Sequence, residues 1–420
     1  MSNLEYPVRR AVLDNGLRIV HSFDGTTAMA AVNVLYNVGA RDEKRSLTGM
    51  AHLFEHLMFG GSANVPDYDS VLTAAGGTNN AWTSSDFTNF YITLPAQNIS
   101  TAFYLESDRM LSLAFNPRSL NVQKGVVVEE FKQTCLDKPY GDLMHIVRRL
   151  AYGADHPYSW PVIGLRPEHI RDVAMEDVKA WFYAHYAPNN AILSVAGNVD
   201  FDTTLRLANE WFGDIPRRDI ASRVLPASGF PTAKVHHVEE AAVPFPMLVL
   251  AIPMDSYGTE RYFAADAITD LLSAGYSARF SEKLVYEVSK GLISTCDASI
   301  IGCEHEGLVL IMAQLSDAST EAFDSAEEMI MDQARRLAVQ GDISPRELER
   351  CYNNFEANFC YSNLGYLSRA TNLAKAEYHG EDINREVRDR RALAVDTIAA
   401  EADRLFNRTP YVRLDYRPKQ

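Results

Sequence analysis

The strongest constraint on the fold of this chain is an internal repeat, because its two halves open with the same succession of strand, strand and helix. Alternating apolar residues predict the strands, and an apolar period close to 3.6 residues predicts the helices. The repeated elements are strands at 17–21 and 31–36 with a helix at 50–59, then strands near 235–240 and 246–252 with a helix near 260–273. Two copies of one such unit predict an α+β fold with two homologous halves, each an antiparallel-rich sheet packed with helices.

The sequence between the two copies has the character of a linker. Residues 216–234 carry three prolines and mixed charge without a clear period. We therefore expect an N-terminal domain at 1–215, a linker at 216–234 and a C-terminal domain at 235–420. Within the first copy, the strands at 17–21 and 31–36 are expected to form a hairpin.

The helix predicted at 50–59 carries two histidines and a glutamate within one turn. The sequence His52-Leu53-Phe54-Glu55-His56 is an inverted form of the zinc-protease motif. Positions i, i+3 and i+4 share a helix face, so His52 and His56 can hold one metal ion with Glu55 beside it. Such a short pattern also arises by chance among surface or core histidines, and its context must decide.

A catalytic zinc site usually takes three protein ligands, so the motif lacks one. The candidates are Glu129 and Glu130, in the helical pattern at 119–137. Glu130 shares a face with Val126 and Val127, where a carboxylate is costly unless it is paired or bound to a cation. Spacing favours Glu130 and leaves Glu129 as the alternative, with a solvated pair of glutamates as the interpretation without a metal.

The second half does not repeat this chemistry. At the position of the motif helix it reads Phe263-Ala264-Ala265-Asp266-Ala267, without a histidine. One metal site per chain is therefore expected, in the first half.

Composition limits the classes of partner. The formal net charge of −15 argues against nonspecific binding of nucleic acid and predicts repulsion from anionic membranes. No apolar run has the length of a membrane span, and the N-terminal residues lack the apolar core of a signal peptide. The five cysteines form no Cys-x-x-Cys pair and are expected to be reduced thiols. These features favour the cytoplasm, or the periplasm if a leader has been removed.

With these residues the chain resembles the pitrilysin/insulinase superfamily of zinc peptidases, in the branch that includes mitochondrial processing peptidases and their bacterial relatives. The resemblance extends over nearly the whole chain. Its landmarks are Leu13–Leu17, Gly49–Phe59, Gly76–Ala81, Val128–Phe131 and Tyr186–Asn190.

The resemblance implies a zinc metalloendopeptidase with one Zn²⁺ held by His52, His56 and Glu130. It implies that Glu55 is the general base that activates zinc-bound water. It also implies that an extended peptide pairs with a strand edge at Asn80 and Ala81. The family has a supporting glutamate where this chain has Gln123, and Gln123 brings no negative charge.

A second departure concerns assembly. Complete relatives use an Arg and a Tyr to hold the substrate carbonyl, but the expected strand at 307–315 has no arginine. Arg279 and Tyr286 fall in a helical pattern and are expected to be structural. The resemblance therefore implies a clamshell dimer, either a homodimer or a heterodimer with a related zinc-less subunit. The competing interpretation is a non-catalytic scaffold subunit of the same fold.

Overall fold

The computed structural model describes residues 5–419, and the chain divides into two compact units. Unit 1 comprises the chain up to Lys132, Trp160–Leu225 and Asn358–Glu386. Unit 2 comprises Gln133–Ser159, Pro226–Ala357 and the chain from Val387 onwards.

Unit 1 is built on a six-stranded sheet in the order β1-β2-β6-β3-β5-β4. Its strands are β1 (Arg9–Val12), β2 (Arg18–Phe23), β3 (Met29–Tyr36), β4 (Thr78–Thr83), β5 (Thr88–Pro95) and β6 (Ala191–Gly197). Strands β2 and β6 are parallel, and the other neighbours are antiparallel. The predicted hairpin of the strands at 17–21 and 31–36 is wrong, because β6 lies between β2 and β3 and pairs with both.

Unit 2 repeats this topology with five strands in the order β7-β11-β8-β10-β9. They are β7 (Val235–Ala241), β8 (Met247–Met254), β9 (Ile293–Ile301), β10 (Gly307–Leu315) and β11 (Val412–Pro418). Strands β7 and β11 are parallel, as β2 and β6 are, and the remaining pairs are antiparallel. The predicted α+β duplication is therefore confirmed, although the sequence did not reveal β11, which comes after a long helical stretch.

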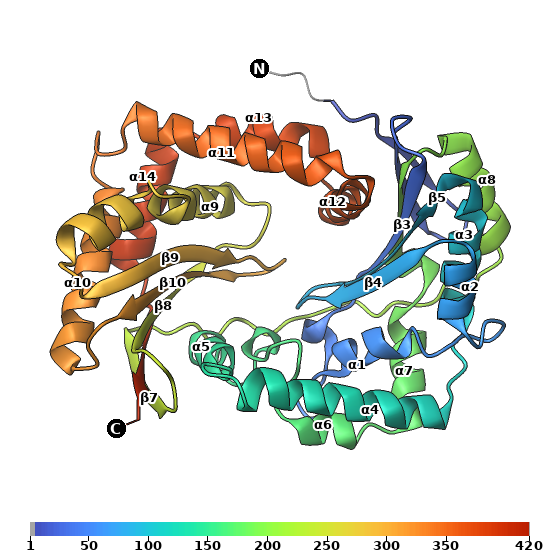
Figure 1. Cartoon of the computed structure of the whole chain (residues 1–420), viewed down its shortest axis with the longest axis horizontal. Coiled ribbons are helices and arrows are strands. Elements are labelled where there is room, and N and C mark those ends of the chain that lie inside the picture. Colours follow the sequence, from blue (N-terminus) through green and yellow to red (C-terminus); the bar gives the residue numbers. More distant parts are fainter. Residues whose placement is uncertain (1–4, 420) are drawn as a thin grey trace. The chain divides into compact units, whose positions relative to one another are not determined.

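Helices complete both units (Figure 1). Those of unit 1 are α1 (Met50–Leu57), α2 (Tyr68–Ala74), α3 (Ile99–Leu111), α4 (Pro117–Phe131), α6 (Pro167–Arg171), α7 (Met175–His185), α8 (Phe201–Phe212) and α12 (Tyr366–His379). Those of unit 2 are α5 (Leu143–Tyr152), α9 (Glu260–Ser273), α10 (Thr320–Arg336) and α14 (Val395–Asp403), with the π-helices η6 (Phe280–Val288) and η8 (Arg404–Arg408). Helix α11 (Pro345–Leu364), helix α13 (Glu386–Arg391) and the π-helical turn η3 (Lys132–Leu136) pass from one unit to the other.

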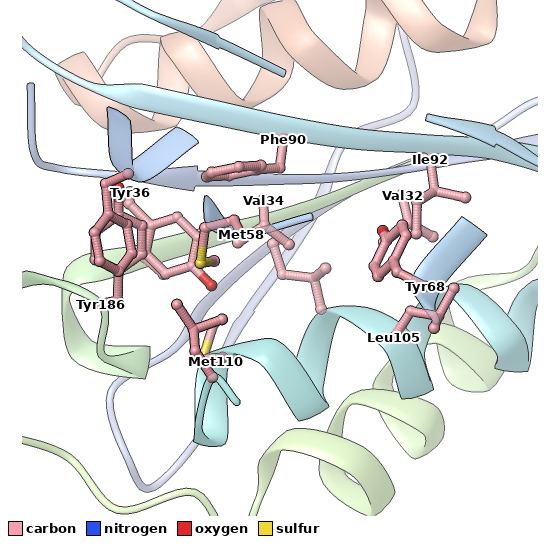
Figure 2. Close-up of a cluster of buried hydrophobic side chains, with 14 of the residues drawn as sticks. Val32, Val34, Tyr36, Met58, Tyr68, Phe90, Ile92, Leu105, Met110 and Tyr186 are labelled. Atoms are coloured by element: carbon pink, nitrogen blue, oxygen red, sulfur yellow. The ribbon is translucent and has the colours of Figure 1, made fainter. Parts of the chain in front are cut away.

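The two faces of the unit 1 sheet are buried by different helices. Alternate side chains of β3 and β5 enter a large core with α3, as Figure 2 shows for Val32, Val34, Phe90, Ile92, Leu105 and Met110. On the opposite face, Ala31 and Ala196 pack against Ala370 of α12. Side chains on a strand point alternately to its two faces, so small residues on this face let α12 approach the sheet closely.

Each unit thus takes one helix from outside its own half of the sequence. Helix α12 packs on β2, β3 and β6 of unit 1, and α5 packs on β8 and β11 of unit 2. Asp142, next to α5, accepts a hydrogen bond from Tyr416 of β11 at 2.5 Å. The predicted division at 1–215, 216–234 and 235–420 remains a prediction about domains, and the compact units add these two exchanged segments to it.

Candidate metal centre and catalytic site

One face of helix α1 packs against the core through its apolar residues, and the opposite face, which carries the motif, remains accessible. Met50, Leu53 and Phe54 are buried, whereas the side chains of His52 and His56 remain 12% and 24% exposed. The helix starts at Gly49 with φ of +85°. A Cβ atom at Gly49 would lie 2.7 Å from the Ile170 side chain, so glycine is required there on both grounds.

The candidate third ligand approaches from α4. Glu130 Oε2 lies 3.7 Å from His52 Nε2 and 3.6 Å from His56 Nε2. Among the described residues, these three form the one group of His, Cys, Asp or Glu that could hold a metal, with ligand atoms within 4.8 Å of one another. Two ligand atoms about 2.1 Å from a tetrahedral zinc ion lie roughly 3.4 Å apart, so the spacing fits zinc.

The two glutamates of α4 have different environments. Glu129 is 60% exposed and forms an ion pair with Lys132 at 2.5 Å, and it is not part of the candidate metal group. The apolar helix face expected around Glu130 is only partly present, because Val127 is buried but Val126 is exposed. Gln123 is half-buried, and its side chain forms no hydrogen bond within the described residues.

The electrostatics of His52 suit a metal ligand. Burial, and then the charge of His56, lower the pKa of His52 to about 4, so the imidazole is neutral near pH 7. A neutral imidazole keeps the lone pair that binds a metal ion. Within residues 5–419, its Nδ1 atom is buried without a hydrogen-bond partner, so packing sets the orientation of this ring.

Glu55 lies beside the three candidate ligands and has a partner of its own. Thr83 Oγ1, at the end of β4, donates a hydrogen bond of 2.7 Å to Glu55 Oε2. Burial raises the pKa of Glu55, while the Thr83 hydroxyl and His56 lower it and Glu130 raises it again. A partly desolvated carboxylate is a stronger base than one in open water, which suits the role of a general base.

One short segment positions both α1 and the end of β4. Glu43, which is buried, accepts hydrogen bonds of 2.9 Å from the backbone N–H groups of Gly49 and Ala51 at the start of α1. Burial raises the pKa of Glu43 to about 8, and the two N–H groups act in the opposite direction. The neighbouring Ala40 and Arg41 donate backbone hydrogen bonds to Ser84 and Ser85, in the turn after β4.

Sequence reasoning missed Glu43 and Thr83. Their partners are set by the folded chain. A glutamate shortly before the glycine that opens the motif helix was the available signal for Glu43.

Asn80 and Ala81 lie on β4, which pairs with β5 alone and forms the edge of the described sheet. Asn80 is exposed and its Oδ1 atom accepts a hydrogen bond of 2.8 Å from the Ala81 N–H. The outer edge of β4 pairs with no other described strand, although the Ala81 N–H is bonded to the Asn80 side chain, and β4 contacts α1. Arg279 is bound to Asp342 at 2.5 Å and to Glu347 at 2.9 Å, in agreement with its expected structural role, and Tyr286 is exposed.

Comparisons with known proteins bear on this site. The family model described as "Insulinase (Peptidase family M16)" matches residues 18–144, which contain α1 and Glu130, and "Peptidase M16 inactive domain" matches residues 172–355. The chain belongs to peptidase family M16. The expected superfamily is thereby confirmed, and the M16 model named inactive covers the half without the motif.

Relatives in family M16 extend over most of the chain. "Zinc protease PqqE" of Helicobacter pylori is 28% identical over 371 residues, which cover 86% of this chain and 81% of that protein. "Uncharacterized zinc protease YmxG" of Bacillus subtilis is 24% identical over 373 residues, covering 88% of each chain.

Solved structures of M16 proteins share the fold. The crystal structure of a protease from Helicobacter pylori has a TM-score of 0.88 at 24% identity, covering 99% of this chain and 100% of the other. An M16 inactive domain from Pseudomonas fluorescens has a TM-score of 0.86 at 15% identity, covering 98% of each chain. At these identities the likeness shows the fold alone. In the described part of the chain, every helix is too short or too polar to cross a bilayer.

Proposed function

We propose that this M16 protein is a zinc metalloendopeptidase that hydrolyses peptides or unfolded polypeptides. The observation that carries the proposal is the meeting of His52, His56 and Glu130, from two helices, with Glu55 on the same turn as the histidines. Two imidazoles and one carboxylate are a donor set of catalytic zinc sites, and they leave one position for water or substrate.

The three ligands would hold one Zn²⁺ ion, which supplies a Lewis acid that polarises the scissile carbonyl and lowers the pKa of water. Glu55 takes a proton from the attacking water and passes it to the leaving amine. Thr83 holds the Glu55 carboxylate in place during this transfer. Glu43 fixes the start of α1, and with it the two histidines.

The open edge of β4 would bind the substrate as an added strand. Backbone pairing there gives affinity with little dependence on sequence, which suits an enzyme that acts on many peptides. Asn80 and Ala81 would contribute backbone groups to this pairing. The edge lies next to Glu55 through Thr83 of the same strand.

The absence of an arginine from β10 favours activity as a dimer, in which a second subunit supplies the missing groups and completes a closed cavity. That subunit would be a second copy or a related chain without the zinc motif, and the expected cytoplasmic or periplasmic location belongs to this proposal as well. The competing proposal is a scaffold subunit. It is supported by the likeness in fold, at a TM-score of 0.78 and 15% identity, to a chain of "Complex III2 from Candida albicans".

One experiment separates the enzyme from the scaffold. The purified chain, alone and mixed with the product of the neighbouring gene, is assayed on a mixed peptide library while its zinc content and its mass in solution are measured. Chelator-sensitive cleavage with about one zinc per chain supports the peptidase. A metal-free chain that cleaves nothing in either form supports the scaffold.

A further inference from the structure

A half-buried lysine lies beside β4, on the face of the sheet opposite Glu55. The Nζ atom of Lys375, on α12, is 4.9 Å from the centroid of the Trp82 ring on β4. Within the described residues, Lys375 forms no hydrogen bond and no ion pair. Burial lowers its pKa, and the charge of Glu386 opposes that shift. No ion pair joins the two groups in the described part of the chain, so the partly desolvated ammonium has no carboxylate in direct contact.

Neighbouring carboxylates are engaged elsewhere. Glu377, two residues along α12, is bound to Arg10 at 2.9 Å. Asp69, near the other end of β4, accepts a hydrogen bond from Asn79. Lys375 thus has no carboxylate in direct contact, although the charge of Glu386 acts on it, in a chain whose formal net charge is −15.

Because side chains alternate between the two faces of β4, Lys375 lies on one face only. A peptide paired with β4 would present every second side chain to it. Thr83 points to Glu55, so Trp82 points to the other face, where its ring contacts Phe87 at 5.1 Å. Phe87 in turn contacts Tyr378 of α12 at 5.2 Å. Asn80 is two residues before Trp82 and shares its face. A peptide added along the edge of β4 turns every second side chain towards this face.

We propose that Lys375 and Trp82 form a substrate subsite that selects an acidic side chain, Asp or Glu, at one position of the peptide bound along β4. This inference rests on the proposed peptidase function. The carboxylate would pair with the lysine ammonium, and the indole ring would cover the aliphatic part of the side chain. Positions one residue to either side point away from the subsite and carry no such preference.

The test is a peptide series in which one position at a time is Glu, Gln or Lys, cleaved by the zinc-loaded full-length chain in its active oligomeric form. We expect kcat/KM to be about tenfold higher for Glu than for Gln at a single position, as for a partly desolvated charge pair. The variant K375M removes this preference, and the charge reversal K375E transfers it to Lys. Lys138, exposed and in unit 2, provides the matched control K138E, which leaves the preference unchanged.

Equal rates for Glu and Gln at every position in the unaltered enzyme would overturn the subsite, and that arm needs no variant. So would an unchanged preference in a folded K375M or K375E, with folding checked by thermal unfolding. In both cases cleavage itself remains, so the proposed function stands. Failure to cleave any peptide removes the proposed function and this subsite together.

Discussion

Helices α1 and α9 occupy the same place in the two units, but their ionisable side chains have different partners. Each follows the strand that has the equivalent position in its sheet, β3 or β8. On α1, His52, His56 and the facing Glu130 leave an open position for an ion. On α9, the carboxylates of Asp266 and Asp270 are bound by the guanidinium of Arg390, which lies 3.0 Å from Asp270 and is buried.

The comparison shows that the two copies of the fold use the same helix position for different purposes. In unit 2 the positive charge belongs to the chain itself, so Asp266 and Asp270 already have a partner in Arg390. In unit 1 the side chains of His52 and His56 on α1 and of Glu130 on α4 are 12%, 24% and 40% exposed, so an ion and a substrate can reach them. A substitution confined to one unit tests the role of that unit alone.

The largest effect is expected from E55Q in unit 1. Glutamine keeps the shape of the side chain but cannot accept a proton, so kcat should fall by about a thousandfold. Zinc content should stay at the level of the unaltered chain, because Glu55 is not one of the three ligands. Peptide hydrolysis and metal analysis of the same sample measure both. Parental turnover in E55Q would show that another group is the base.

The matching change in unit 2 is R390M, which leaves Asp266 and Asp270 without their cation. Removing one partner of a buried ion pair costs about 3–5 kcal/mol, and the free energy of unfolding in urea should fall by that amount. The neighbouring Arg388 is 68% exposed, so R388M serves as the control and should change little. A loss under about 1 kcal/mol in R390M would mean that the pair does not stabilise unit 2.

A smaller effect is expected from E43Q, measured at about pH 9 so that the Glu43 carboxyl of the parent, whose pKa is raised to about 8, is ionised. The amide group of glutamine can accept one of the two N–H groups of Gly49 and Ala51 but meets the other with a donor. Zinc affinity should weaken by about 10–100-fold, as when other groups that orient metal ligands are lost. Competition with a chelator measures it. Unchanged affinity in a folded E43Q would remove Glu43 from the site.

The smallest effect is expected from T83V, in the pH profile. Glu55 must be ionised to take a proton, so activity falls as pH drops through its pKa. The Thr83 hydroxyl lowers that pKa. Its loss should raise the pKa of Glu55 and move the acid limb of kcat/KM to higher pH. Rates above the limb should approach those of the parent. A limb that stays in place, or moves to lower pH, would contradict this role.

The sequence predicted the parts of the site that depend on local spacing. The spacing of His52, Glu55 and His56 requires only a helix, and α1 is one. Glu130 was preferred over Glu129 because of its helix face, and it is the glutamate that lies against the histidines. The repeated order of strands likewise predicted the duplicated α+β fold, since each strand is identifiable by its own alternation.

Features that depend on distant contacts could not be predicted in this way. Insertion of β6 between β2 and β3 follows from pairing across most of unit 1, which no local pattern encodes. The exchange of α5 and α12 depends on which sheet face each helix buries, and both helices look alike as amphipathic segments. The bonds made by Glu43 and Thr83 arise only once α1, its preceding segment and β4 are in place.

The most direct test of the account is the zinc content of three chains: the unaltered protein, E130Q and E129Q. We predict about one zinc per chain in the unaltered protein and in E129Q, whose side chain is bound to Lys132. We predict a loss of most of the metal in E130Q, because a neutral amide replaces one of three ligands. Equal zinc in E130Q and the unaltered protein, or no zinc in the unaltered protein, would contradict a metal centre made by His52, His56 and Glu130.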